Sequence, residues 1–295
     1  MMPEHDLRSQ DKPLAPGLYL VATPIGNLED ITLRALRVLQ SVDRIACEDT
    51  RQTQKLLNHF DIRTPTVSYH MHNEGPRTDE LLAELNQGAR IAVVSDAGTP
   101  GIADPGAPLV AAAIAAGISV YPIPGANAAI SALIASGLST EQFLFHGFLP
   151  AKAGQRKTAL EALERNGATH IFYEAPHRIL DTLHDIEAVF GANQHIVIAR
   201  ELTKLHEEFL RGAVGELHAQ LTARPAIRGE IVLLLAPDAP SGTAAQTLSI
   251  AQEVAALMKS EALNEKDALK RIARERGIGK SEAYRELQRE QNRKR

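Results

Sequence analysis

Carboxylates and cations follow predicted strands at three places in this chain, and such residues can carry out proton transfer and anion binding. The three groups are Glu48, Asp49 and Arg51, then Glu174, His177 and Arg178, and finally Arg200, Glu201, Lys204 and Glu207. A carboxylate can take a proton from a hydroxyl, and a cation can stabilise an oxyanion or hold a phosphate. Buried carboxylate–arginine pairs are also common structural features, so a structural role for each pair stays open.

A loop of small residues gives the strongest indication of a ligand site. Residues 93–106, VVSDAGTPGIADPG, run from a predicted strand into a stretch with three glycines and two prolines. Such a backbone can approach a ligand closely, and the carboxyl ends of strands are where open α/β sheets bind ligands. The loop contains neither G-x-G-x-x-G nor G-K-[ST], which argues against a dinucleotide or Walker A site. At its end we expect a helix with Asp104 as N-cap and Pro105 in the first position.

Two further loops of this kind follow other predicted strands. They are residues 23–27 (TPIGN) and 123–128 (IPGANA), each with a glycine and a proline. If all three loops converge on one crevice, their backbone amides and carbonyls can cradle a flat, nucleoside-like ligand.

The elements that must position these loops alternate between short β-branched runs and helical patterns as far as residue 236. Strands are predicted at 18–22, 44–47, 90–95, 119–121, 143–147, 170–173, 195–199 and 230–235. Helices are predicted at 31–39, 78–85, 108–116, 128–136, 157–164, 179–189 and 214–221. This alternation is typical of an α/β fold with largely parallel strand pairing. We expect two α/β domains, 17–138 and 139–238, and a helical C-terminal segment.

Length and composition limit the class of protein. A chain of 295 residues corresponds to about two domains. The lone cysteine, Cys47, favours a reducing, cytoplasmic setting. The longest apolar region, 109–138, is interrupted by glycines and prolines, so we expect no membrane span. Residues 1–16 are expected to be a disordered leader.

The C-terminal segment, 239–295, differs from the rest in charge. The net charge of the whole chain is −4, yet residues 266–295 contain eleven basic and five acidic residues. A helix over 265–276, a glycine-containing turn and a last helix from Ser281 match a helix-turn-helix outline. Arg285 and Arg289 lie one turn apart on that last helix, as residues facing a nucleic acid would. A solvated helical end that binds nothing is the alternative.

Six ordered motifs identify the family that the sequence resembles. They are ATPIGNL (22–28), CEDTR (47–51), SDAGTPGIADPG (95–106), FYEAPHR (172–178), ARELTKLHEE (199–208) and RGEIVLLL (228–235). Together they resemble the tetrapyrrole-methylase-type (class III) S-adenosylmethionine-dependent methyltransferases over roughly residues 17–236. Tetrapyrrole-modifying members carry a Gly-Asp-Pro-type loop where this chain reads Ser95-Asp96-Ala97-Gly98. The sequence is more similar to the branch that methylates a cytidine ribose 2′-hydroxyl in 16S rRNA of the small ribosomal subunit.

This resemblance implies two α/β domains with S-adenosylmethionine in the cleft between them, in a homodimer. By position, the implied cofactor-binding residues are Pro24, Ser95, Asp96, Ala97, Thr99, Asn127, Ala128, Tyr173 and Leu202. His70 and His72, with Glu74 nearby, could suggest a metal site, but no third ligand is evident and sulfonium methyl transfer does not require a metal.

Methyl transfer from a sulfonium to a ribose hydroxyl is a displacement that positioning and proton removal assist. We expect Glu174 or Glu201 near the reacting hydroxyl, with Arg51, Arg178 and Lys204 holding phosphates. Two alternatives stay open: a methyltransferase acting on a tetrapyrrole, and a non-catalytic nucleic-acid-binding protein that senses S-adenosylmethionine.

A basic segment lies at the junction of the expected domains. Lys152, Arg156 and Lys157 follow the strand predicted at 143–147 and could contact the RNA backbone. A solvent-exposed helix start would have the same composition.

Overall fold

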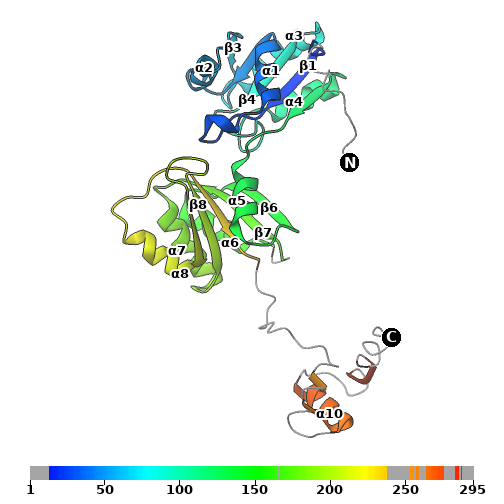
Figure 1. Ribbon diagram of the computed structural model, residues 1–295, viewed down its shortest axis with the longest axis vertical. Helices are drawn as coiled ribbons and strands as arrows, with labels where there is room; N and C mark the ends of the chain where they lie inside the picture. Colours follow the sequence, from blue (N-terminus) through cyan, green and yellow to red (C-terminus); the bar gives the residue numbers. More distant parts are fainter. Residues whose placement is uncertain are drawn as a thin grey trace. The chain divides into compact units, whose positions relative to one another are not determined.

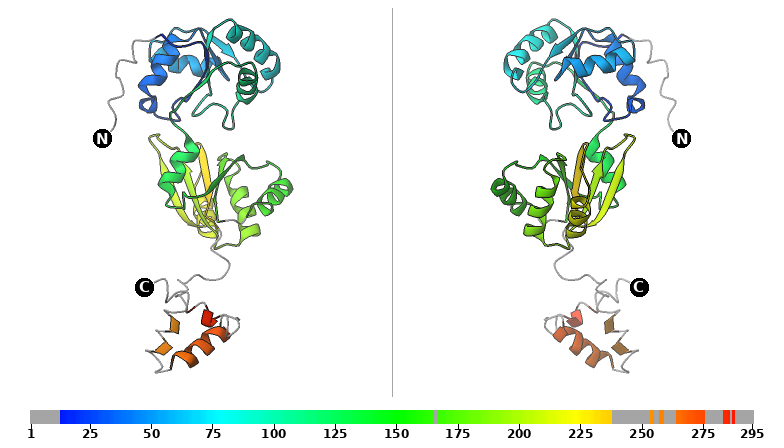
Figure 2. Two further views of the ribbon diagram at one scale, coloured as in Figure 1. Left: turned by 90° about the vertical axis from the view of Figure 1, so that its right-hand side faces the viewer. Right: turned by 90° about the vertical axis from the view of Figure 1, so that its left-hand side faces the viewer.

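The computed structural model describes residues 13–164, 167–237, 253–254, 257–258, 264–275, 283–285 and 287. Most of the leader predicted at 1–16 lies outside these residues. The chain divides into two compact units, Met1–Asp238 and Ala239–Arg295. The first unit contains two five-stranded sheets with helices packed on them (Figures 1 and 2).

The first sheet is parallel throughout, with the strand order β3-β2-β4-β1-β5. Its strands are β1 (Gly17–Val21), β2 (Arg44–Cys47), β3 (Thr66–Ser68), β4 (Arg90–Val94) and β5 (Val120–Ile123). Its helices are the single 3-10 turn η2 (Leu28–Asp30), α1 (Leu33–Ser41), α2 (Thr50–His59), α3 (Glu74–Asn86) and α4 (Ala107–Ala115). Because parallel strands end at one edge, the loops after β1, β2, β4 and β5 emerge there together.

The sequence predicted neither α2 nor β3. Strand β3 has three residues, too few for a visible alternation. Helix α2 is mostly polar and buries only Thr53 and Leu57. Its start is nevertheless fixed locally, because the Asp49 carboxylate accepts a hydrogen bond of 2.8 Å from the Arg51 backbone N–H.

The second sheet has the order β6-β7-β10-β8-β9 and is mixed. Its strands are β6 (Phe143–Phe148), β7 (Thr169–Glu174), β8 (His195–Arg200), β9 (Glu208–Ala213) and β10 (Ile231–Leu235), with α6 (Ala153–Glu161), α7 (Ile179–Phe190) and α8 (Val214–Thr222). Only β6 and β7 pair in parallel. The prediction of largely parallel pairing is wrong here, because the short connection 201–207 returns the chain as a hairpin.

Helix α5 (Ala128–Ser136) packs on the second sheet rather than on the first. Its small apolar face, with Ala129, Ala132 and Leu133, lies against Ile171 and Val232. Because α5 packs on the second sheet, the boundary between the two α/β parts lies before α5. The sequence predicted this boundary after residue 138. The α5 composition, rich in alanine, gave no sign of which sheet it would cover.

Helix α4 begins at Ala107, with Gly106 as its N-cap, so the predicted start at Asp104 and Pro105 is wrong. Gly106 has φ 140° and ψ −31°, a conformation that a residue with a Cβ rarely adopts. Its N–H donates to Glu74 Oε1 at 3.0 Å, and the Tyr69 hydroxyl also donates to this oxygen, at 3.2 Å. Asp104 therefore lies in the loop before the helix and does not cap it.

The C-terminal unit contains α10 (Glu265–Glu275) and a small apolar core. This core comprises Val254, Ala268, Leu269, Ile272, Ala273, Ala283 and Leu287. Arg285 is exposed, whereas Arg289 lies outside the described residues. Across the described part of both units, every helix is too short or too polar to cross a membrane.

Candidate active site

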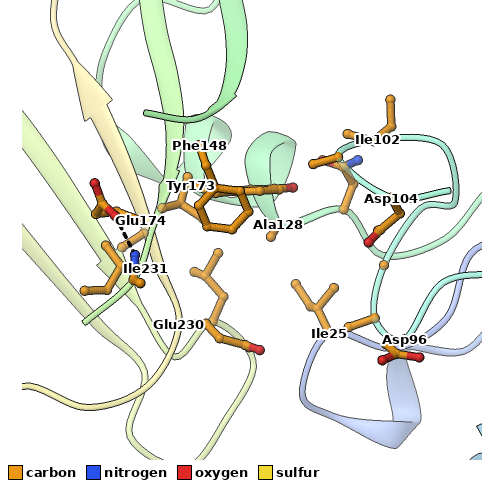
Figure 3. Close-up of a pocket in the computed structure, with 18 of the residues that line it drawn as sticks. Ile25, Asp96, Ile102, Asp104, Ala128, Phe148, Tyr173, Glu174, Glu230 and Ile231 are labelled. Carbon is orange, nitrogen blue, oxygen red and sulfur yellow. Dashed lines mark hydrogen bonds between the residues drawn. The ribbon is translucent and has the colours of Figure 1, made fainter. Parts of the chain in front are cut away.

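A pocket of about 440 Å³ lies between loops of the first sheet and strands of the second (Figure 3). This volume falls within the roughly 300–1,000 Å³ typical of small-molecule sites. One side comprises Ile25, Glu48, residues 96–99 and residues 102–104, with Asn127 and Ala128 at the start of α5. The other comprises Phe148, residues 173–176, Ala199, Leu202 and residues 229–232.

The three glycine-containing loops meet at this pocket, as expected. Thr23 and Gly98 exchange two backbone hydrogen bonds, of 2.8 and 3.1 Å, which join the first loop to the second. Thr99 Oγ1 donates to the Ala126 carbonyl at 3.1 Å and accepts from Asn127 Nδ2 at 3.2 Å, which joins the second loop to the third. Asn127 also caps α5 by accepting from the Ile130 N–H at 3.0 Å. The loops therefore hold one another in place before any ligand binds.

Most of the residues expected to bind the cofactor line the pocket. Those that do are Asp96, Ala97, Thr99, Asn127, Ala128, Tyr173 and Leu202. Pro24 and Ser95 do not line it. Ser95 is buried, and its hydroxyl lies 3.2 Å from each of the Ala97 and Gly98 carbonyls, so it supports the loop from behind.

Glu174 lines the pocket, but its carboxylate belongs to a buried network beneath the pocket. One oxygen accepts from Arg178 Nη2 at 2.6 Å and from the Ala175 N–H at 2.8 Å. The other accepts from Thr182 Oγ1 at 2.6 Å. The Glu174 side chain is 0% exposed. The network ties the end of β7 to α7 and satisfies both carboxylate oxygens.

Glu201 and Lys204 form a second network, at the rim of the pocket. Lys204 Nζ lies 2.7 Å from Glu201 and 2.7 Å from Glu230, whose side chain is 76% exposed. Glu201 also accepts from the Glu230 N–H at 3.0 Å. The hydrogen bond from Lys204 lowers the pKa of Glu201 below its ordinary value.

Gly229 makes this second network possible. Its φ is 91°, and a Cβ at this position would lie 2.4 Å from the Glu201 side chain. Only glycine leaves room there for Glu201.

The loop of Glu201 also reaches the first sheet. Asn27 N–H donates to Thr203 Oγ1 at 3.1 Å. Glu201 and Thr203 have φ of 55° and 64°, which is unusual for residues with side chains. Such strain tends to be kept where a loop must hold a functional shape.

Arg51 lies outside the pocket. Its side chain is 87% exposed, and its guanidinium pairs with Asp49 at 2.9 Å. This pair holds the pKa of Asp49 well below its usual range, at about 2. Arg51 is thus presented on the surface, in the first turn of α2, three residues after the pocket residue Glu48.

Three carboxylates of the pocket, on Glu48, Asp96 and Asp104, have no ion pair among the described residues. No Lys, Arg or His of the described part of the chain lines the pocket. Burial, together with the charges of Glu48 and Asp96, raises the pKa of Asp104 to about 6. Burial and the charge of Asp96 likewise raise the pKa of Glu48.

The sequence did not identify Asp104 as a pocket residue, because its pattern predicts a helix N-cap at this position. The signal against that prediction was Gly106-Ala107-Pro108, which is an equally good helix start.

Comparison with known proteins gives the family. The profile of Tetrapyrrole (Corrin/Porphyrin) Methylases matches residues 17–218, well over half of the chain. The chain belongs to this family. The chain is 52% identical to a ribosomal RNA small subunit methyltransferase I of Halalkalibacterium halodurans, over 90% of this chain and 93% of that protein. It is 48% identical to the protein of the same name from Synechocystis, over 90% and 95%.

Solved structures of the same fold are more distant in sequence. Uroporphyrin-III-C-methyltransferase from Thermus thermophilus superimposes with a TM-score of 0.53 at 20% identity, over 75% of this chain and 94% of that one. A diphthine synthase gives 0.57 at 14% identity, over 74% and 89%. These likenesses confirm the predicted α/β fold.

The chain is a methyltransferase that uses S-adenosylmethionine, as the family does. This cofactor carries a positive sulfonium and a positive ammonium group, and the unpaired carboxylates of Glu48 and Asp96 suit such a ligand. Ala97, Gly98, Thr99 and Ala128 line the pocket with small side chains and backbone groups, which suit the flat adenosine part of this cofactor. The donor set of the pocket therefore fits the cofactor.

The basic residues expected to contact RNA fall into two groups. Lys152 is exposed at the N-terminus of α6, and Lys157 is partly exposed. Arg156 is buried and pairs with Asp185 of α7 at 2.6 Å, so it does not reach a phosphate. The expectation of a phosphate contact for Arg156 is corrected by this placement, because the helix turns its side chain into the core.

Proposed function

We propose that this chain transfers a methyl group from S-adenosylmethionine to the 2′-hydroxyl of a cytidine in 16S rRNA. The observation that carries the proposal is the identity of about half of all residues to ribosomal RNA small subunit methyltransferases I over 90% of the chain. The alignment over 90% of the chain extends beyond residue 218, where the match to the methylase family ends. Because the family consists of methyltransferases, the alternative of a non-catalytic protein that senses S-adenosylmethionine is not favoured.

The charge of the pocket supports a neutral acceptor group. Glu48, Asp96 and Asp104 repel anions, so neither a phosphate nor the carboxylates of a tetrapyrrole are favoured inside. A ribose hydroxyl and a pyrimidine base are neutral and can enter. A single-stranded or flipped-out nucleotide would therefore present its sugar to the pocket while its phosphates stay outside.

The residues around the pocket divide into those that shape it and those that hold RNA. Asp96, Ala97, Thr99, Asn127, Ala128, Tyr173 and Leu202 would hold the cofactor, with Pro24 and Ser95 supporting the loops. The cofactor supplies the activated methyl group, and the fixed loops orient it for displacement. Glu174 and Arg178 keep the end of β7 rigid, whereas Glu201 and Lys204 fix the rim.

The phosphates would be bound at the surface. Arg51, Lys152 and Lys157 of the first unit, with Arg285 and Arg289 of the C-terminal unit, are the proposed contacts. Such contacts position the RNA without reading its sequence. The partner would be the small ribosomal subunit in the cytoplasm.

We further propose a homodimer, as the family resemblance implies. Ile130 and Ile134 share a face of α5 and are 41% and 72% exposed, and Phe143 and Phe148 of β6 are exposed as well. An apolar surface of this kind is common at protein interfaces. Light scattering of Ile134→Asp against the unaltered protein tests this, and an unchanged mass would contradict an interface there.

The test of the reaction uses small ribosomal subunits from cells that lack this protein. They are incubated with the enzyme and methyl-labelled S-adenosylmethionine, and the labelled nucleoside is identified by mass spectrometry. Label on a cytidine ribose supports the proposal. Label on a base, or transfer only to a tetrapyrrole, contradicts it.

A further inference from the structure

Methylation of a hydroxyl needs a group that accepts its proton, and the two carboxylates expected from the sequence are poorly suited. Both Glu174 oxygens accept hydrogen bonds from Arg178, Thr182 or the backbone, and the side chain is fully buried. Glu201 pairs with Lys204 at 2.7 Å, and this cation lowers its pKa. A carboxylate held by a permanent cation is a weak base.

Asp104 differs from both in its position and in its partners. It follows β4 in the loop that ends at Gly106, and its carboxylate points into the space between the two sides of the pocket (Figure 3). The preceding residue, Ala103, has φ 62°, a left-handed conformation that a residue with a Cβ adopts rarely. This turn directs Asp104 inward, and no cation lines the pocket among the described residues.

We propose that Asp104 is the catalytic residue that accepts the proton from the ribose 2′-hydroxyl, an inference that rests on the function proposed above. The new O–C bond forms as the O–H bond breaks, and the proton moves to a carboxylate oxygen of Asp104. The electron pair of the breaking C–S bond stays on sulfur, which leaves as a neutral thioether. Charge and atoms balance without a metal or a further reactant.

The surroundings of Asp104 adjust its basicity to this task. Burial raises its pKa most, Glu48 and Asp96 raise it further, and a hydrogen bond with Ser95 lowers it, to a value of about 6. Tyr173 faces it from β7 across the pocket (Figure 3). An acceptor with a pKa of about 6 is ionised at neutral pH and more basic than an ordinary aspartate, which favours proton transfer.

The inference is tested with Asp104→Asn, which keeps the size of the side chain but removes its basicity. Single-turnover methylation at saturating S-adenosylmethionine is measured from pH 5 to 8.5, and cofactor affinity is measured by calorimetry. We expect the rate at pH 7.5 to fall by about a hundredfold or more, with cofactor affinity within about tenfold. The acidic limb of the pH profile should disappear.

Matched variants distinguish the loss of a proton acceptor from a loss of charge or of folding. Asp79→Asn makes the same change on the exposed face of α3 and should leave rate and pH profile unchanged. Asp104→Glu keeps a carboxylate and should keep the acidic limb at a reduced rate, which also covers the case that the Asn variant does not fold. Glu48→Gln removes a charge that raises the pKa of Asp104, so it should move the limb to lower pH.

The outcomes separate the inference from the proposed function. If the unaltered enzyme methylates rRNA ribose and Asp104→Asn does so within threefold of its rate, Asp104 is not the acceptor. If Asp104→Asn only weakens cofactor binding and the saturated rate is normal, Asp104 is a binding residue and the inference fails. If the unaltered enzyme labels no ribose, the proposed function fails and the inference falls with it.

Discussion

The Arg156→Met variant tests whether Arg156 stabilises the fold or binds RNA. Arg156 Nε and Nη2 lie 2.7 and 2.6 Å from Asp185 Oδ2, and Nη1 donates to the Ala151 carbonyl at 3.1 Å. The two side chains are 4% and 3% exposed. Methionine retains much of the volume but leaves the Asp185 carboxylate buried without its main partner.

The magnitude follows from the cost of an unpaired buried charge. Removing one member of a buried pair typically costs about 3–5 kcal/mol. Lys157 Nζ remains 3.5 Å from the other Asp185 oxygen and offsets part of this cost. We therefore expect the free energy of unfolding to fall by about 2–4 kcal/mol. The double variant Arg156→Met/Asp185→Leu removes the buried charge as well and should recover most of the loss.

Urea denaturation followed by circular dichroism measures this effect. With a slope of about 2–3 kcal/mol/M, the midpoint should shift by about 1 M. Lys152→Met is the matched control, because Lys152 is exposed in the same segment, and its midpoint should stay within about 0.2 M. An unchanged midpoint for Arg156→Met, together with weakened RNA binding, would refute the structural assignment.

Three other predictions concern the rim, acid stability and the C-terminal unit. Gly229→Ala places a Cβ 2.4 Å from Glu201, so calorimetry should show cofactor affinity reduced by about tenfold or more; unchanged affinity would show that the rim does not shape the site. Glu208 has its pKa lowered from 4.5 to about 2, chiefly by Arg224, so it stabilises the fold above about pH 5 and loses this effect as pH falls toward 2. Glu208→Gln should therefore cost about 1–2 kcal/mol at pH 7 and much less at pH 3, and an equal cost at both values would contradict this. Truncation after residue 238, the boundary of the first unit, should leave cofactor affinity unchanged but lower methylation of ribosomal subunits at least tenfold; full activity of the truncated chain would exclude a role for the tail in binding RNA.

Local patterns predicted the strands and loops of the site well. The loops at 23–27, 95–101 and 123–128 follow buried apolar strands, and glycine and proline mark them clearly in the sequence. Their convergence follows from parallel pairing in the first sheet. What local patterns could not give was the direction of single side chains.

Four errors have one physical origin, namely that tertiary packing decides among locally equivalent choices. Asp104 and Gly106 both suit an N-cap, and contact of Gly106 with Glu74 selects the later start. Helix α5 is apolar enough for either sheet. The local sequence around Arg156 predicts a surface cation, and only the folded structure brings Asp185, 29 residues away, into contact with it. The antiparallel pairing of the second sheet likewise follows from a hairpin that no strand pattern specifies.

The most direct test of the central claim is the position of the methyl group that this enzyme adds. Small ribosomal subunits from cells lacking the protein are incubated with it and labelled S-adenosylmethionine, and the 16S rRNA is digested to nucleosides. We predict a single labelled nucleoside, 2′-O-methylcytidine. Label on a base, or no label under conditions where calorimetry shows bound S-adenosylmethionine, would contradict it.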